Sequence, residues 1–341
     1  MVDVISPSMP PIAETSVEMV QLVFPEHAGA PGQIHGGRMM QWITQAGTMA
    51  ASRLARGTAV LGAMDDIDFL EPVKVGEIAI LRAQVEYVGT SSLEVGVRVW
   101  AENVTTGRRT VTLNSHLAFV AVDEDVKPRP VPDKIQPADA HEALLYEEAR
   151  ARREQRLARR GAKRERGAEP GGLADSDVEV RWRFESVRSV LPEDVIFGNL
   201  MFPGKMLMDI DEAGGILSMR YCKGFVMTAC LDAMDFYTPI FSHEVVIFKA
   251  ALNHVGRSSL EVGVKVLAET PWSGQVRHAC TAYLAYVHLA LGPDGLRPAP
   301  CTPFTPSTPT ERRRWEEAAA RREARLARVK RLQAQLAQER G

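Results

Sequence analysis

Apolar and polar residues alternate strictly along the segment 92–102. Positions 93, 95, 97 and 99 hold Leu, Val, Val and Val, with Glu, Gly and Arg between them. A period of two predicts a β-strand with one buried face. The segments 78–87 and 111–122 also predict strands, and a short strand over 19–24 ends at Pro25.

A helical period begins near Gly36. Apolar residues recur at positions 39, 40, 43, 46, 47, 50 and 54, which lie on one face of a helix. The preceding segment 26–35 contains Gly29, Pro31 and Gly32, which predict a loop. One helix packed against a sheet of about five strands predicts an α+β fold for this part of the chain.

The chain contains two copies of this pattern, separated by a constant offset of 167 residues. The segments 86–102 and 253–269 are identical at twelve of seventeen positions. The same offset relates shorter matches from about residue 20 to residue 104, so neither copy carries a net insertion. A unit of this length indicates a duplicated domain and not a solenoid repeat. We expect the sheets of the two copies to pair edge to edge, which would hide an exposed edge.

Each copy is followed by a charged helix. The segments 146–160 and 315–329 are rich in Ala, Glu, Arg and Leu, which favour helices. Glycine, proline and charge over 161–177 predict a flexible linker, and the prolines of 299–309 predict an extended connector. The predicted organisation, in chain order, is a first domain at 17–133, a charged helix and linker at 134–178, a second domain at 179–300, and a proline-rich connector with a C-terminal charged helix at 301–341.

Composition and charge narrow the possible functions. The 41 Lys and Arg residues nearly balance the 43 Asp and Glu residues, and the formal net charge of −2 excludes a globally basic nucleic-acid-binding protein. The arginine-rich segment 150–166 is interleaved with Ala, Leu and Glu, which favours a helix packed on the protein over a nucleic-acid contact. No apolar run is long enough to span a membrane, so we expect no membrane partner.

Cysteine usage and the N-terminal residues indicate the compartment. The four cysteines lie in the second half and form no C-x-x-C pair, which argues against a disulfide framework or a structural zinc site. Residues 1–14 lack the basic-then-apolar pattern of a signal peptide. We therefore expect a cytoplasmic protein without a bound metal.

In the first copy, most of the candidate functional residues lie where the loop meets the helix. There His35 is followed by Gly36 and Gly37. Glycines at a helix N-terminus leave backbone N–H groups open to a ligand, and the helix dipole favours negative charge, such as an oxyanion formed from a thioester carbonyl. A simple turn with an N-cap would explain the same glycines. The second copy has Asn199 and Gly204 in this region.

A carboxylate interrupts the apolar helix of the second copy. Asp211 aligns with Thr44 of the first copy, and the following Glu212 aligns with Gln45. An acid on a core-forming helix is unfavourable unless it is solvated or paired. Asp211 is therefore a candidate general base that activates water, or a candidate nucleophile. A solvent-facing helix position is the alternative interpretation.

Several motifs together resemble the hotdog-fold acyl-CoA thioesterases. The first copy carries P-E-H-A-x-x-x-G-x-x-H-G-G followed by I-T-Q-A-G, and the second carries F-x-G-K-M-L-x-x-I-D-E-A-G. The strand V-G-x-S-S-L-E-V-G-V occurs in both. The pattern is most similar to the tandem-hotdog, brain-type cytosolic acyl-CoA hydrolase group. The resemblance covers residues 17–131 and 187–298.

This resemblance implies two tandem hotdog domains, each a long helix wrapped by a curved antiparallel sheet, paired into a double hotdog. It implies hydrolysis of a fatty acyl-CoA by water, with no metal or cofactor beyond the coenzyme A of the substrate. The family's active site is shared between the paired domains. Its aspartate matches Asp211, and its backbone donors match His35, Gly36 and Gly37. The resemblance also implies a homo-oligomer, a trimer of double hotdogs.

The chain departs from the family at one site position. The family's loop asparagine matches Gly29 in this sequence. Loss of a hydrogen bond that orients water or the carbonyl typically lowers the rate by ~10²-fold or more. His27 and Gln33 are the candidates to replace it.

The reciprocal site would combine the loop of the second copy with the helix of the first. Its residues would be Thr44, Gln45, Asn199 and Gly204, but Pro203 replaces a glycine and removes an N–H group. We therefore expect at most one hydrolytic site per chain, with the reciprocal site binding ligand or inactive. By resemblance, four serines line the coenzyme A groove, although a β-turn would explain them equally: Ser91, Ser92, Ser258 and Ser259.

Two rival functions remain at this stage. A non-catalytic acyl-CoA-binding or sensing protein is favoured by Gly29 and Thr44. A hotdog hydratase or dehydratase would need an Asp/His pair at the loop joint, where only His35 is suitably placed. The motifs H-E-x-x-H, G-x-S-x-G and G-x-G-x-x-G are absent, so metalloprotease, α/β-hydrolase and dinucleotide-binding functions have no support.

Overall fold

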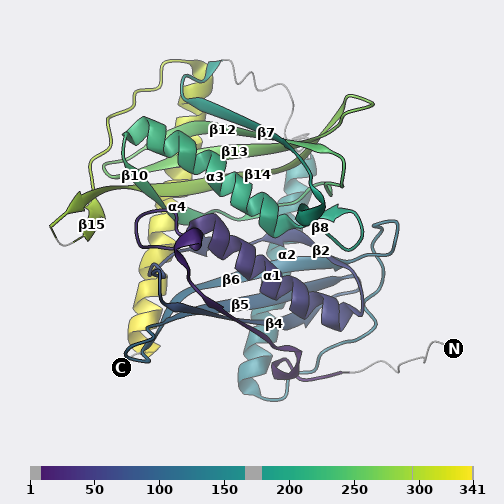
Figure 1. Cartoon of the computed structure of the whole chain (residues 1–341). Coiled ribbons are helices and arrows are strands. Elements are labelled where there is room, and N and C mark those ends of the chain that lie inside the picture. Colours follow the sequence, from purple (N-terminus) through teal and green to yellow (C-terminus); the bar gives the residue numbers. More distant parts are fainter. Residues whose placement is uncertain (1–8, 166–178, 294, 340–341) are drawn as a thin grey trace.

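Two long helices lie side by side at the centre of the molecule, with a sheet on either side of the pair (Figure 1). The computed structural model describes residues 9–165, 179–293 and 295–339. The central helices are α1 (Gly36–Ala55) and α3 (Pro203–Cys222), which begin 167 residues apart. The repeat in the sequence is therefore a repeat in the structure.

The first sheet is antiparallel and has the strand order β1-β4-β5-β6-β2-β11. Its core side chains sit at alternate positions along the strands and pack on α1. The expected strands occur, with β1 and β6 each beginning two residues earlier than predicted. The strands are β1 (Val17–Leu22), β2 (Ala59–Met64), β4 (Ile78–Val88), β5 (Ser92–Glu102), β6 (Arg109–Ala121) and β11 (Met234–Asp235).

The second sheet repeats the plan with the order β3-β10-β14-β13-β12-β7, and β15 pairs with β14. A short hairpin of β8 and β9 forms in the segment that corresponds to the loop of the first half. The strands are β3 (Ile67–Asp68), β7 (Arg183–Ser189), β8 (Val195–Ile196), β9 (Leu200–Met201), β10 (Phe225–Leu231), β12 (Val245–Val255), β13 (Ser259–Thr270), β14 (Gln275–Gly292) and β15 (Gly295–Pro298).

The two halves exchange short strands where their sheets meet. β3 belongs to the first half but pairs with β10, and β11 belongs to the second half but pairs with β2. The inner edge of each sheet is thus covered by a strand from the other half. The two sheets therefore meet edge to edge, as predicted, through these exchanged strands. β1 and β7 stay at the outer edges.

Local chemistry sets the limits of the central helices. The His35 side chain caps α1 by accepting the N–H of Gly37, and Arg56 ends the helix in the left-handed conformation at φ 48°. In α3, Pro203 occupies the first turn, where its missing N–H costs nothing, and Lys223 ends the helix at φ 53°. No helix of the described residues is long and apolar enough to cross a membrane.

The charged helices α2 (Ala140–Glu165) and α4 (Pro309–Glu339) pack on the strands of the two sheets. The linker predicted from 161 is wrong at its start, because the helix continues through Glu165. The rest of that linker, 166–177, lies outside the described residues. The predicted extended connector gives way to helix at Pro309, its last residue. The domain boundaries themselves stay predictions.

Arginines from these helices reach buried acids on the sheets. Arg156 of α2 donates to Glu94 at 2.8 Å, and Arg325 of α4 donates to Glu261 at 2.6 Å. Further along each helix, Arg160 pairs with Asp235 of the second half and Arg328 pairs with Asp68 of the first half. Each charged helix therefore binds its own domain and then crosses to the other one.

We expect Arg156→Ala to destabilise the protein by about 3–5 kcal/mol, because Glu94 is buried and would lose its charged partner. Burial already raises the pKa of Glu94. A carboxyl with a raised native pKa contributes most to stability below its unfolded-state pKa and loses that contribution as pH rises through the native pKa. The variant, which leaves Glu94 without its charged partner, should therefore recover stability as pH falls. Urea unfolding midpoints at several pH values measure both effects.

The matched control is Arg150→Ala on the same helix. Arg150 is exposed, and its ion pairs among the described residues run along the helix to Glu147 and Glu154. Its loss should cost less than about 0.5 kcal/mol. Equal losses for the two variants would show that the buried pair contributes no more than a surface one.

Candidate functional site

The N-terminus of α1 points at the middle of α3. The Gly37 N–H donates to Asp211 Oδ2 over 2.6 Å, and it also lies 3.1 Å from His35 Nδ1. The structure thus brings together Asp211 and the His35–Gly37 turn, which sequence analysis assigned to one shared site from opposite halves of the chain. The partial positive charge of the helix N-terminus stabilises the carboxylate.

The other carboxylate oxygen of Asp211 is also bound. Thr228 Oγ1 of β10 donates to Oδ1 over 2.7 Å, and the Tyr286 hydroxyl of β14 lies 3.1 Å from the same oxygen. Asp211 is only 1% exposed, so a solvent-facing role is excluded. Burial and the neighbouring carboxylate raise the pKa of Tyr286 well above its ordinary value, which keeps the phenol protonated as a donor.

The two glycines of the turn are required by close contacts. A Cβ on Gly36 would stand 2.6 Å from Thr228 Cβ, and one on Gly37 would stand 2.9 Å from the Met208 backbone Cα. A side chain at Gly36 would displace Thr228 of β10, and one at Gly37 would separate α1 from α3. The glycines therefore allow the Gly37 N–H to reach the carboxylate, which a simple turn would not require.

His35 lies beside the carboxylate with both ring nitrogens near an acid. Nδ1 is 3.3 Å from Asp211 Oδ2, and Nε2 is 3.6 Å from Glu212 Oε2. Because Nδ1 accepts the Gly37 N–H, the proton of the neutral ring resides on Nε2 and faces Glu212. The His35 side chain thus accepts a hydrogen bond at the site, a contact that sequence analysis did not assign, because for hydrolysis it used only the His35 backbone.

The packing around Gly29 explains why this position holds no asparagine. A Cβ on Gly29 would stand 2.7 Å from His35 Cδ2, so a larger residue would displace the imidazole from its present position. His27 accepts the Phe24 N–H and packs edge-on against Trp42. The Gln33 Oε1 atom is buried and accepts no hydrogen bond within the described ranges. Gln33 is therefore the better placed of the two predicted replacements to receive a donor from a ligand.

The reciprocal joint, where the N-terminus of α3 meets α1, has different side chains from the joint between the N-terminus of α1 and Asp211 of α3. Thr44 is fully buried, and its hydroxyl donates to the Met40 carbonyl over 2.8 Å. Gly204 lies close to Gln41, where a Cβ would be 3.1 Å from the Gln41 Cα. Gln45 and Asn199 are exposed and do not join Thr44. The four residues predicted for a second site are therefore not brought together as one polar cluster.

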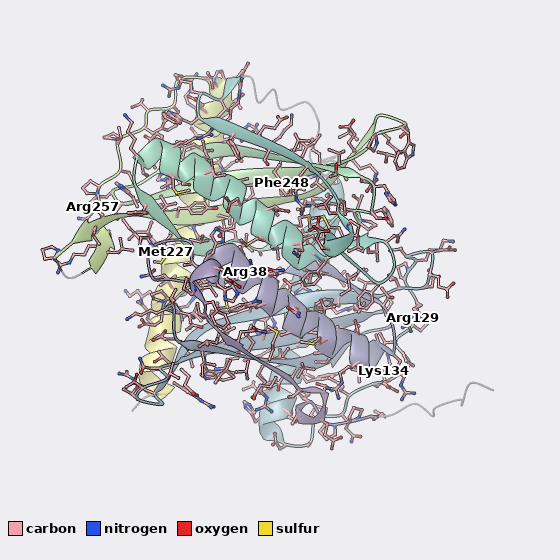
Figure 2. The ribbon with its side chains drawn as sticks, in the orientation of Figure 1. Arg38, Arg129, Lys134, Met227, Phe248 and Arg257 are labelled. Carbon is pink, nitrogen blue, oxygen red and sulfur yellow. The ribbon has the colours of Figure 1, made fainter. Side chains whose placement is uncertain are left out.

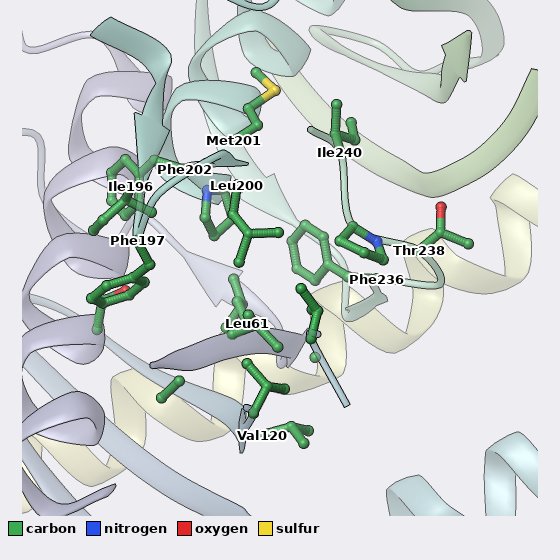
Figure 3. A pocket seen from close by; sticks show the side chains of 18 of the residues that line it. Leu61, Val120, Ile196, Phe197, Leu200, Met201, Phe202, Phe236, Thr238 and Ile240 are labelled. Carbon is green, nitrogen blue, oxygen red and sulfur yellow. The ribbon is translucent and has the colours of Figure 1, made fainter. Parts of the chain in front are cut away.

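An apolar cavity of about 240 Å³ lies at this reciprocal joint (Figure 3). Its walls come from both halves, including Leu61 of β2 and Phe202, which precedes α3. Its few polar lining residues include Thr48, Thr238 and Arg160. The lining is mostly apolar and offers no carboxylate to activate water.

The serines predicted to line a coenzyme A groove form turns. Gly89 donates to the Ser92 carbonyl, and Gly256 donates to the Ser259 carbonyl. The Ser92 hydroxyl accepts from Arg153 of α2. Ser91 and Ser258 accept backbone N–H groups from the ends of β6 and β14. These contacts support the turn interpretation, and the role in coenzyme A binding stays a prediction.

Sequence analysis missed Thr228 and Tyr286, although the repeat contains the signal. At the offset of 167 residues, Thr228 aligns with Leu61 and Tyr286 aligns with Phe119. Asp211 aligns with Thr44 in the same way. The carboxylate and both of its side-chain donors are thus absent from the first copy. A search for positions at which the copies differ in polarity would have found the site.

We expect Gly37→Ala to destabilise the joint by about 1–3 kcal/mol, because the new methyl group would overlap the α3 backbone. Gly215→Ala is the matched control on α3, since its Cβ would meet nothing closer than 4.0 Å. The control should be neutral or stabilising by about 0.5–1 kcal/mol. Urea unfolding measures both, and an unaffected Gly37→Ala protein would contradict the close packing.

Comparison with known proteins supports the family resemblance found in the motifs. The thioesterase superfamily model matches residues 31–108 and 198–272. The cytosolic acyl coenzyme A thioester hydrolase of Mus musculus is 26% identical over 318 residues, which covers 89% of this chain and 82% of that protein. The uncharacterized acyl-CoA thioester hydrolase YkhA of Bacillus subtilis is 35% identical over 147 residues, which covers 43% of this chain and 85% of that protein.

Two solved structures each match about half of the chain. An apo-hexameric acyl-CoA thioesterase is 36% identical, covers 45% of this chain and 97% of its own, and has a TM-score of 0.43. An acyl-CoA hydrolase of Staphylococcus aureus, solved with butyryl coenzyme A, is 33% identical, covers 46% of this chain and 95% of its own, and also has a TM-score of 0.43. The family resemblance found in the motifs is confirmed. The chain belongs to the thioesterase superfamily and consists of two tandem hotdog domains.

Proposed function

We propose that this protein hydrolyses acyl-CoA thioesters to a carboxylic acid and coenzyme A at the joint between α1 and α3. The observation that carries the proposal is the buried Asp211 carboxylate, held at the N-terminus of a helix from the other domain. The relatives named as acyl-CoA thioester hydrolases support the substrate class. Those named cytosolic support a cytoplasmic location.

In this proposal Asp211 acts on the attacking water and accepts its proton directly. The neighbouring His35 imidazole, whose Nδ1 lies 3.3 Å from the carboxylate, accepts the Gly37 N–H and holds the turn in place. Thr228 and Tyr286 hold the carboxylate in one orientation and keep it positioned for each turnover. The reaction then needs no metal or cofactor beyond the coenzyme A of the substrate.

The thioester oxygen would meet the partly buried N-terminal end of α1. The Gly37 N–H already donates to Asp211, so it is not the principal oxyanion donor. The Gly36 N–H occupies the first helical position, which has no intrahelical acceptor, and the helix dipole reinforces it. We therefore assign polarisation of the carbonyl to Gly36.

Asp211→Asn should lower kcat by about 10²-fold or more, since the amide cannot accept the proton of water. Release of free thiol from short-, medium- and long-chain acyl-CoA substrates measures the effect and gives the chain-length preference. Asp209→Asn is the control: Asp209 lies on the same helix and pairs with Arg188 at 2.6 Å, away from Asp211. It should retain turnover.

Thr44→Val tests whether the reciprocal joint contributes. The substitution keeps the shape of the side chain and removes its hydroxyl, so turnover should be unchanged if hydrolysis occurs only at the Asp211 joint. A loss equal to that of Asp211→Asn would assign catalysis to both joints. Negligible turnover by wild-type and Asp211→Asn proteins that both bind coenzyme A would instead favour a non-catalytic acyl-CoA-binding protein.

We also propose that the chain forms a homo-oligomer, a trimer of double hotdogs by analogy with the family. Apolar side chains at equivalent positions of the two edge strands support it. Val20 of β1 and Val187 of β7 are each 55% exposed, and the nearby Phe24 and Leu191 are 49% and 47% exposed. Such repeated apolar exposure on sheet edges favours association.

Light scattering of the full chain should give a mass that is a multiple of 37.6 kDa. A Val20→Lys, Val187→Lys double variant should shift that mass toward a single chain, because two charges would be buried in the contact. A single-chain mass for the wild-type protein at every concentration tested would refute the assembly.

A further inference from the structure

Three metal-binding side chains meet at the C-terminal end of α3, away from the Asp211 joint. Cys222 is the last residue of α3, His288 lies near the end of β14, and Cys301 follows β15 in the connector to α4. One ligand atom from each residue lies within 4.8 Å of the others. Arg257, whose carbonyl accepts the Cys301 N–H, is labelled in Figure 2 beside this end of β14.

The separation of the two sulfur atoms fits a shared metal. Cys222 Sγ and Cys301 Sγ are 4.0 Å apart. Two Zn–S bonds of about 2.3 Å at a tetrahedral angle place the sulfur atoms about 3.8 Å apart. A disulfide bond would require the sulfur atoms to approach to about 2.0 Å. The observed spacing therefore matches a common metal ligand pair with little movement.

The histidine is prepared to be the third ligand. His288 Nδ1 lies 2.9 Å from the Pro300 carbonyl, which can only accept, so Nδ1 carries the ring proton. Nε2 therefore presents its lone pair, the arrangement by which backbone carbonyls orient metal-binding histidines. Gly224 makes room for this nitrogen, because a Cβ there would stand 2.7 Å from Nε2.

The backbone around the cluster is fixed by bonds that need no metal. The Ala299 N–H donates to the His288 carbonyl, and the Cys301 N–H donates to the Arg257 carbonyl, each over 2.8 Å. The Tyr221 hydroxyl donates to the Thr302 carbonyl over 2.7 Å. The connector is thus held with its thiol directed toward Cys222, so the ligands are arranged in advance.

The first domain fills the equivalent place with apolar residues. Its Val131 N–H donates to the Thr90 carbonyl, as Cys301 donates to Arg257 at the equivalent turn. At the offset of 167, Ala55 aligns with Cys222 and Ala121 with His288. All three residues of the first domain are buried. Packing alone is therefore satisfied by apolar side chains here, and the second domain alone carries three ligands.

We propose that Cys222, His288 and Cys301 bind one Zn²⁺ ion, with a water molecule at the fourth position. Two thiolates and an imidazole select a borderline-soft divalent cation over Mg²⁺ or Ca²⁺. The ion fastens the proline-rich connector to α3 and β14, and so fixes the start of α4. The proposal differs from the sequence-based expectation of no metal, which stays untested. The sequence carries no C-x-x-C motif to indicate this cluster, because its ligands come from three separate segments.

The test uses the full chain, purified under reducing conditions without chelators or a histidine tag. Elemental analysis should find about one zinc per chain, and replacement by Co²⁺ should give a thiolate-to-cobalt charge-transfer band. Cys222→Ala, His288→Ala and Cys301→Val install the residues of the first domain, which preserves packing. Each should reduce retained zinc to near none, while Cys280→Ala, a buried cysteine outside the cluster, should retain it.

Unfolding midpoints confirm that each variant is folded before its metal content is compared. The proposal is overturned if reduced wild-type protein neither retains nor binds Zn²⁺, or if the three variants retain it as fully as the control. A Cys222–Cys301 disulfide, found by mass spectrometry in protein alkylated at cell lysis, would also overturn it in favour of a redox pair. Thiol release from acyl-CoA is measured separately, so the outcome does not depend on the proposed hydrolysis.

Discussion

The structure depends on how a buried carboxylate is stabilised at the contact between two domains. Asp211 cannot remain charged in the interior without donors, and one of them, the Gly37 N–H, belongs to the other half of the chain. This requirement sets the approach of α1 to α3, and it explains the two adjacent glycines. It also makes the double hotdog the smallest unit that can contain the site, because neither domain completes it alone.

Duplication has produced two joints with the same backbone arrangement, one lined by polar and the other by mostly apolar side chains. Around one joint the chain places Asp211, Thr228 and Tyr286, and around the other it places Thr44, Leu61 and Phe119 at the aligned positions. The first joint is filled by hydrogen bonds, and the second contains an apolar cavity. Divergence has therefore changed a linked set of side chains while the helices and strands kept their spacing.

The two charged helices make the same kinds of contact in the two halves. Their arginines satisfy buried acids on each sheet and then reach across to the exchanged strands β11 and β3. A helix that is polar along most of its length is thereby tied to the core by a few charged contacts. The proposed zinc ion would add a further attachment for α4 that α2 does not have.

The sequence by itself determined the repeat, the fold class, the strands and the central helices, and it singled out Asp211 and the His35–Gly37 turn as candidates for one site. Those features depend on local periodicity and on motifs, which a single chain displays in order. Only the tertiary structure decided that Thr228 and Tyr286 complete the carboxylate site, and that Cys222, His288 and Cys301 meet. Their partners are distant in the sequence, and no local pattern records which side chains the two packed domains bring within hydrogen-bonding or metal-binding distance.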